Sequence, residues 1–175
     1  VHLGAVGAAL DRVRAAKKAV LAFATAYAND GLHLASHASE IWMDPLGGVL
    51  LAGPGGNQLF YKGLLDQLKV TAHVYRVGTF KSAVEPFLLT GMSPEARENA
   101  TALYGALWGE WQAAVAKARP KANIRLAAND PVGWAAASGG DLGQAALKAG
   151  LVDTLGSRAA FDARLVKLVG ADGWS

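Results

Sequence analysis

The sequence contains no cysteine, which excludes a disulfide framework, a thiolate nucleophile and any metal site built on cysteine. Charged residues are also few, at 18% of the chain, and the net charge of +3 comes from basic residues scattered in short groups. A nucleic-acid-binding surface usually has a denser basic stripe. No apolar run approaches the roughly 18–20 residues of a membrane-spanning helix, and no signal-peptide pattern opens the chain. We therefore expect a soluble chain that does not bind nucleic acid.

What the chain does have is enough apolar sequence for a folded core. It has 175 residues, of which 52% are hydrophobic, and this favours a single domain over residues 1–175. No internal repeat and no separating linker is evident. The chain begins at Val1 without a methionine and enters a helical pattern at once. We expect it to be a piece of a longer protein, with any membrane anchor outside it.

The hydrophobic periodicity alternates between short apolar runs and helical stripes, which predicts an α/β fold. Asn29, Asp30 and Gly31 mark a turn after the first apolar run, and Asn57 is expected to cap a helix after a glycine-rich turn. Gly150 is expected to end another helix. Strands are predicted at 20–26, 40–45, 47–53 and 71–77, helices at 3–17, 58–69, 94–118 and 158–169, and loops at 119–123 and 129–133.

The longest predicted helix begins with a strong start signal. Ser93 is a good N-cap residue, Pro94 suits the first helical position, and Glu95 places negative charge in the first turn. The stripe that follows is apolar and partly aromatic, which is typical of a core or of a subunit contact. It comprises Ala96, Ala100, Leu103, Tyr104, Leu107, Trp108, Trp111 and Val115.

A single lysine, Lys81, stands in the apolar stretch 77–87 between a predicted strand and a predicted helix. The first turn of a helix disfavours an ammonium group, so a lysine there is unusual. A lysine base near neutral pH needs burial that lowers its pKa from about 10.4 to roughly 7–8. Neighbouring apolar residues offer such burial, whereas pairing with Glu85, four residues later, would oppose it. The alternative is an exposed, charged lysine at a helix end.

The stretch 76–87, RVGTFKSAVEPF, followed by MSPEARE at 92–98, resembles the bacterial signal peptide peptidase A family. The resemblance runs from near residue 5 to the C-terminus. It implies the Clp protease/crotonase superfold, with repeated β-β-α units. It also implies that Lys81 is the general base of a serine-lysine dyad, in which the lysine takes the proton of an attacking serine hydroxyl.

In the long form of that family the chain is an internal duplication, and the serine comes from the second half. The resemblance therefore implies an N-terminal, catalytic-base half, whose nucleophile lies outside these residues and which is inactive alone. At the position matching the serine stands Asn29. The resemblance also implies signal peptides and other unstructured chains as substrates, a homo-oligomer, no cofactor, and a place on the periplasmic side of the bacterial inner membrane.

Other candidate sites have weaker patterns. His33 and His37 lie one helical turn apart beside Ser36 and Ser39, but a metal site needs a third ligand. The glycine-rich turn 53–57 lacks the ending of a phosphate-binding loop. Two alternative functions stay open. One is an acyl-CoA hydratase or isomerase, although Glu40, Glu85 and Glu110 do not fall in the expected contexts. The other is a non-catalytic scaffold, in which Lys81 is structural.

Overall fold

The computed structural model describes residues 2–75, 77–78 and 81–170, which form two compact units. The first unit contains the chain up to Ala52 and again from Trp111, and the second contains residues 53–110. The second unit is thus inserted in the sequence of the first, and its C-terminal boundary falls inside the long helix α5, Pro94–Ala118. Because the helical pattern continues through that boundary, the sequence gives no sign of it.

The first unit is built on a small parallel sheet. Strands β1 (Leu21–Ala24), β2 (Glu40–Met43) and β3 (Thr154–Leu155) pair in that order, with Leu21 opposite Glu40 and Trp42 opposite Thr154. Helix α2, Asn29–Ser36, connects β1 to β2, as a parallel pair requires. The structure is therefore mixed α/β, as the sequence predicts.

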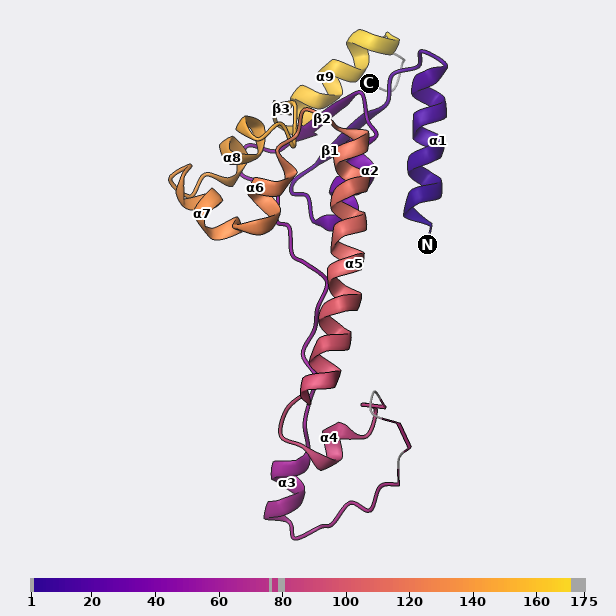
Figure 1. Ribbon diagram of the computed structural model, residues 1–175. Helices are drawn as coiled ribbons and strands as arrows, with labels where there is room; N and C mark the ends of the chain where they lie inside the picture. The colour runs from indigo at the N-terminus through magenta and orange to yellow at the C-terminus, as the bar shows by residue number, and fades with distance from the viewer. Residues whose placement is uncertain (1, 76, 79–80, 171–175) are drawn as a thin grey trace. The chain divides into compact units, whose positions relative to one another are not determined.

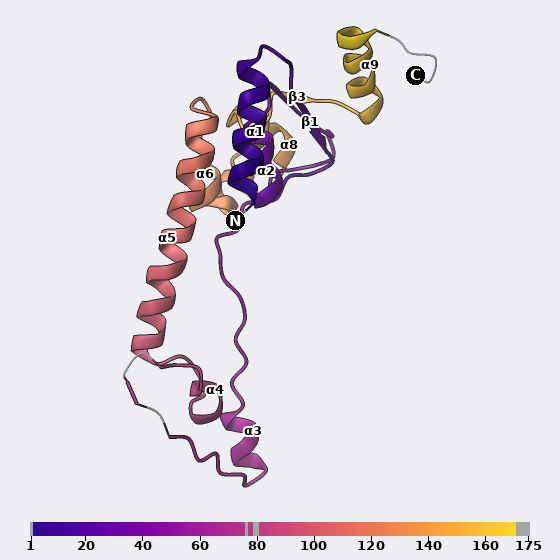
Figure 2. The same cartoon turned by 90° about the vertical axis from the view of Figure 1, so that its right-hand side faces the viewer.

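The two faces of β2 pack against different partners. Ile41 and Met43 are fully buried on one face, and the side chains of Glu40 and Trp42 alternate with them along the strand. Trp42 meets Phe161 of helix α9, Arg158–Val169, edge to face at 5.9 Å between ring centroids. Both views show α9 on one side of the strands and α2 on the other (Figures 1 and 2). The sheet is therefore covered by helices on both faces.

Helix α1, Leu3–Ala15, packs on α2, and the two meet where a glycine allows close approach. A Cβ atom at Gly7 would lie 2.5 Å from Nε2 of His37, which follows α2. The core beneath these helices consists of aliphatic side chains from separate parts of the sequence, each stabilising the fold by roughly 1.5–3 kcal/mol. The largest fully buried ones are Leu32, Ile41, Met43, Val49, Val115, Leu151 and Val152.

Three short helices complete the first unit: α6 (Ile124–Asn129), α7 (Pro131–Ala136) and α8 (Leu142–Lys148). Asn123, Asp130 and Asp141 cap them through their side chains. Gly150, with φ +69°, follows the end of α8, which confirms the predicted helix stop. The predicted loop at 119–123 is also confirmed. The one at 129–133 is largely wrong, because Pro131 occupies the first turn of α7.

The second unit contains α3 (Lys62–Gln67), α4 (Glu85–Leu88) and the first part of α5. The rings of Tyr61 and Phe87 stack at 5.7 Å and join α3 to α4. The start of α5 is confirmed, since Ser93 Oγ accepts a hydrogen bond from the Ala96 amide. Its apolar stripe is only partly buried, because Leu103 and Leu107 are about half exposed.

Three predicted features of residues 47–77 are wrong. The described residues of 71–77 form no strand, and within 47–53 only Val49 makes a bridge, to Tyr27. A strand needs a partner along its length, and neither segment has one in the described part of the chain. Asn57 caps no helix, because α3 begins five residues later with Tyr61 at its N-cap.

Candidate active site

Lys81 lies in the second unit, in the irregular segment that precedes α4. Helix α4 begins at Glu85, so Lys81 is not in the first turn of a helix, and the expected strand-to-helix junction is absent from the described residues. Phe80, one of the neighbours expected to bury it, lies outside the described residues. The argument from the helix dipole therefore does not apply to Lys81.

The lysine side chain is exposed, and its aliphatic stem lies over a glycine. A Cβ atom at Gly78 would lie 3.7–3.8 Å from Cγ, Cδ and Cε of Lys81, and Gly78 has φ +106°, a conformation that favours glycine. Of the other expected neighbours, Val84 is half-buried and Phe87 is exposed by 45%. The burial that a lysine base requires is not supplied by the described residues of this chain.

Glu85 is buried, with only 2% of its surface exposed, and it supports the start of α5. Its two carboxyl oxygens accept hydrogen bonds from Ser93, one from the amide at 3.1 Å and one from the hydroxyl at 2.6 Å. The same hydroxyl caps α5. Glu85, four residues after Lys81, thus has a structural role. The sequence did not reveal this role, because the partner Ser93 lies eight residues further along the chain.

Asn29 is the first residue of α2, directly after the turn that follows β1. Its side-chain amide donates to the carbonyl of Ala52 and accepts from the Ala52 amide at 3.1 Å. Its own carbonyl accepts from the indole N–H of Trp111 at 3.2 Å. The Asn29 side chain therefore pairs with both backbone groups of Ala52, as a residue of a neighbouring strand would. It fixes the irregular segment that contains Ala52, and the sequence gave no sign of this role.

Among the described residues, the rings of His33 in α2 and His37 at its C-cap have neither a serine hydroxyl as hydrogen-bonding partner nor a third metal ligand beside them. Ser36 donates to the backbone carbonyl of His33, and the ring centroids of His33 and His37 are 5.8 Å apart. Burial, and secondarily the adjacent His37, lowers the pKa of His33. Across the described ranges, no three His, Asp or Glu side chains gather to hold a metal ion.

Asp11 and His37 come together from α1 and the end of α2. Asp11 Oδ1 is 3.0 Å from His37 Nδ1, within ion-pair distance. The two groups are not aligned as a hydrogen bond, and the buried nitrogen has no hydrogen-bonding partner among the described residues. A short distance without alignment gives only a weak interaction, so Asp11 and His37 are weakly coupled.

Of the three glutamates considered for hydratase chemistry, two are hydrogen-bonded to other residues and one is exposed. Glu40 accepts two hydrogen bonds from Arg164, and Glu85 accepts from Ser93. Glu110 is exposed on α5. The glycine-rich turn at 53–57 leads into no helix, so it has no helix N-terminus to offer a phosphate. No described feature favours acyl-CoA chemistry.

Comparison with known proteins decides the family. The model of peptidase family S49 matches residues 12–172, nearly the whole chain and including Lys81. The chain belongs to peptidase family S49. This S49 chain is 41% identical over 172 residues to Protease 4 of Salmonella typhi and 39% identical over 124 residues to Protease 4 of Haemophilus influenzae.

The S49 chain spans only part of these relatives. The match to the Salmonella protein covers 97% of this chain and 27% of that protein, and the match to the Haemophilus protein covers 71% and 20%. No described helix of the S49 chain is both long and apolar enough to cross a membrane.

Proposed function

We propose that this S49 chain is the catalytic-base half of a serine endopeptidase of the signal peptide peptidase A type, and that Lys81 is the base. The observation that carries the proposal is the family match, which extends through the stretch around Lys81. Two relatives named Protease 4 support peptide cleavage as the activity of the whole protein.

The proposed chemistry is proton transfer coupled to acyl transfer. The neutral amine of Lys81 takes the proton of a serine hydroxyl while the serine oxygen attacks the scissile carbonyl. The ammonium then returns the proton to the leaving amine, and an ester links the peptide to the serine. Water hydrolyses this ester in the second half of the cycle, with the lysine again as base.

The exposure of Lys81 supports a second protein segment as its partner. Water favours the charged form of an amine, so a lysine base must be desolvated before it can accept a proton. Lys81 is exposed to solvent in the described part of this chain, and the relatives are several times longer. We propose that the serine-bearing half covers Lys81 and excludes water from it.

The remaining parts of the proposal follow from the same resemblance. The chain adopts the first half of a duplicated Clp protease/crotonase-like fold, and Asn29 stands where the second half carries its serine. The substrates are unstructured apolar peptides, including cleaved signal peptides. The assembly is a homo-oligomer on the periplasmic side of the bacterial inner membrane, and it uses no cofactor.

The test is cleavage of an unstructured apolar peptide by the whole peptidase with Lys81→Ala. We expect kcat to fall by about 100-fold to 10,000-fold, the usual contribution of a general base, with folding and assembly unchanged. Lys62→Ala is the matched control, because Lys62 is also a lysine of the second unit and its ion pair with Asp66 is exposed. Full activity of Lys81→Ala would reduce this chain to a scaffold.

A further inference from the structure

One surface of the first unit brings together two groups of cations that are far apart in the sequence. One group lies at the C-terminal end of α1, and the other lies at the C-terminal end of α5. Both views show these two helix ends at the same end of the first unit (Figures 1 and 2). Arg14 borders three adjoining hollows, and cations of both groups line them. We call this the basic surface, and its cations are Arg14, Lys17, Lys18, Lys117, Arg119 and Lys121.

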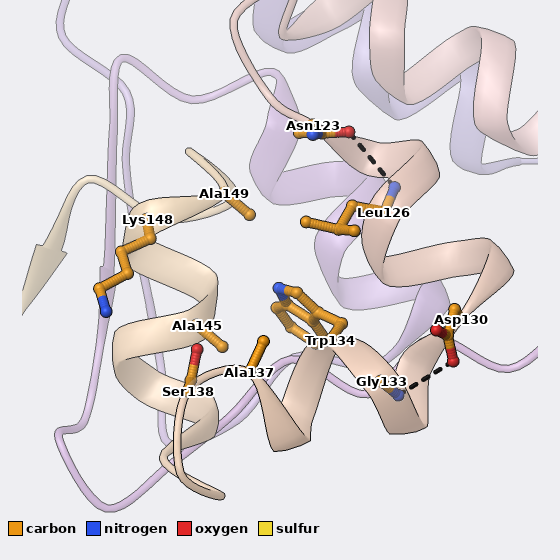
Figure 3. A pocket seen from close by; sticks show the side chains of 10 residues that line it. All are labelled: Asn123, Leu126, Asp130, Gly133, Trp134, Ala137, Ser138, Ala145, Lys148 and Ala149. Atoms are coloured by element: carbon orange, nitrogen blue, oxygen red, sulfur yellow. Dashed lines mark hydrogen bonds between the residues drawn. The ribbon is translucent and has the colours of Figure 1, made fainter.

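The positive charge of the chain is concentrated on the basic surface. Its hollows are lined by six cations but by only two carboxylates, Asp11 and Asp153, so its formal charge is +4. The whole chain has a net charge of +3, and the remainder of the chain is therefore slightly acidic. By contrast, the hollow between α6, α7 and α8 has one cation in its lining, Lys148, and one carboxylate, Asp130 (Figure 3).

The lysines of the basic surface carry its unpaired charge. All four are exposed, and within the described ranges none of them forms an ion pair. The two arginines are engaged, because Arg14 lies 3.8 Å from Asp11 and Arg119 pairs with Asp153. A small anion needs donors that converge on one point. Flexible lysines that are spread over two helix ends instead suit an extended anionic surface.

We propose that the basic surface binds the anionic headgroups of a phospholipid membrane. Each lysine or arginine near such a membrane adds to the attraction, and clusters of about four to eight are typical of proteins that bind anionic lipids. The hollows have no Phe, Tyr or Trp in their linings, so they lack the rings on which nucleic-acid bases stack. The choice of a membrane over an acidic protein rests on the inner-membrane location in the proposed function.

The test is cosedimentation of the 175-residue chain with phosphatidylcholine vesicles, with and without the anionic lipid phosphatidylglycerol. We expect binding only to the anionic vesicles, and weaker binding as salt screens the charges. Lys18→Gln combined with Lys121→Gln removes one lysine from each group and should weaken binding about 30-fold. Lys148→Gln combined with Lys167→Gln is the matched control and should change binding little. It removes the same charge at two exposed lysines of the first unit that lie outside the basic surface.

Lys17→Gly separates loss of charge from loss of folding. Lys17 has φ +58°, a left-handed conformation that favours glycine, so this variant should not lower Tm. It should nevertheless weaken binding to the anionic vesicles about fivefold. Circular dichroism of each variant confirms that it is folded before binding is compared. A lowered Tm without a change in binding would contradict the role of Lys17 in this surface.

Equal binding to both kinds of vesicle would overturn the proposal, and so would equal losses in the test and control pairs. Binding to polyglutamate without binding to vesicles would also overturn it, because an acidic protein would then be the partner. Lys81→Ala should bind vesicles as the wild type does. Vesicle binding with peptide cleavage that does not depend on Lys81 would contradict the proposed base alone. Cleavage that depends on Lys81, without vesicle binding, would contradict the basic surface alone.

Discussion

Glu85 accepts hydrogen bonds from both the amide and the hydroxyl of Ser93, eight residues later in the chain. The hydroxyl in turn accepts from the Ala96 amide, so the helix cap and the buried carboxyl group form one network. Glu85 thereby connects the first turn of α4 to the start of α5. Lys81 lies four residues before Glu85. The Glu85–Ser93 contact therefore lies next to the segment that carries the proposed base.

Ser93→Ala should destabilise the second unit by about 2 kcal/mol. Roughly half of this is the lost cap, and the remainder is the loss of donors to a buried carboxyl group. Ser157→Ala is the control, because Ser157 caps α9 at 3.2 Å through the Ala160 amide and bonds to no carboxyl group in the described ranges. We expect it to cost only about 1 kcal/mol. Urea denaturation measures both values, and equal losses would show that Glu85 adds nothing to the cap.

Two glycines of α1 should respond to alanine with opposite signs. Alanine at Gly7 would place its methyl group 2.5 Å from the His37 ring, so either α1 or that ring must shift, at a cost of about 1–3 kcal/mol. Alanine at Gly4 meets nothing within 4 Å and should raise stability by up to about 1 kcal/mol through helix propensity. Thermal unfolding followed by circular dichroism gives both signs. A stabilising Gly7→Ala would mean that α1 does not pack on His37.

The Glu40–Arg164 pair should make the stability of the first unit depend on pH. The hydrogen bonds from Arg164 lower the pKa of Glu40 below its ordinary value of 4.5. Because the folded-state pKa is below that of the unfolded state, the stabilisation is fully present above about pH 4.5. It is lost as the pH falls through the folded-state value.

Arg164→Gln tests this relationship by removing the partner. We expect its Tm to lie a few degrees below that of the wild type at about pH 7, and the difference to shrink at about pH 3. Lys62→Gln disrupts an exposed pair of the second unit and should change Tm little at either pH. A Tm difference that does not vary with pH would show that Arg164 acts through packing alone.

The local features of this chain were predictable because they depend on neighbouring residues. The apolar spacing predicted α1, α5 and α9, Ser93 and Pro94 predicted the start of α5, and Gly150 predicted the end of α8. The stretch around Lys81 gave the family resemblance, which the match to family S49 confirmed at the level of the family. Each of these signals lies within a few residues of the feature that it predicts.

Tertiary structure decided everything that depends on a distant partner. Residues 71–75 have strand-like alternation but no partner strand in the described chain, so the alternation alone did not make a strand. The bonds from Asn29 to Ala52 and from Ser93 to Glu85 bring together residues that no local pattern connects. The sequence thus determined the helices, their caps and the family. Only packing determined which distant polar groups pair, such as Glu85 with Ser93 and Asn29 with Ala52.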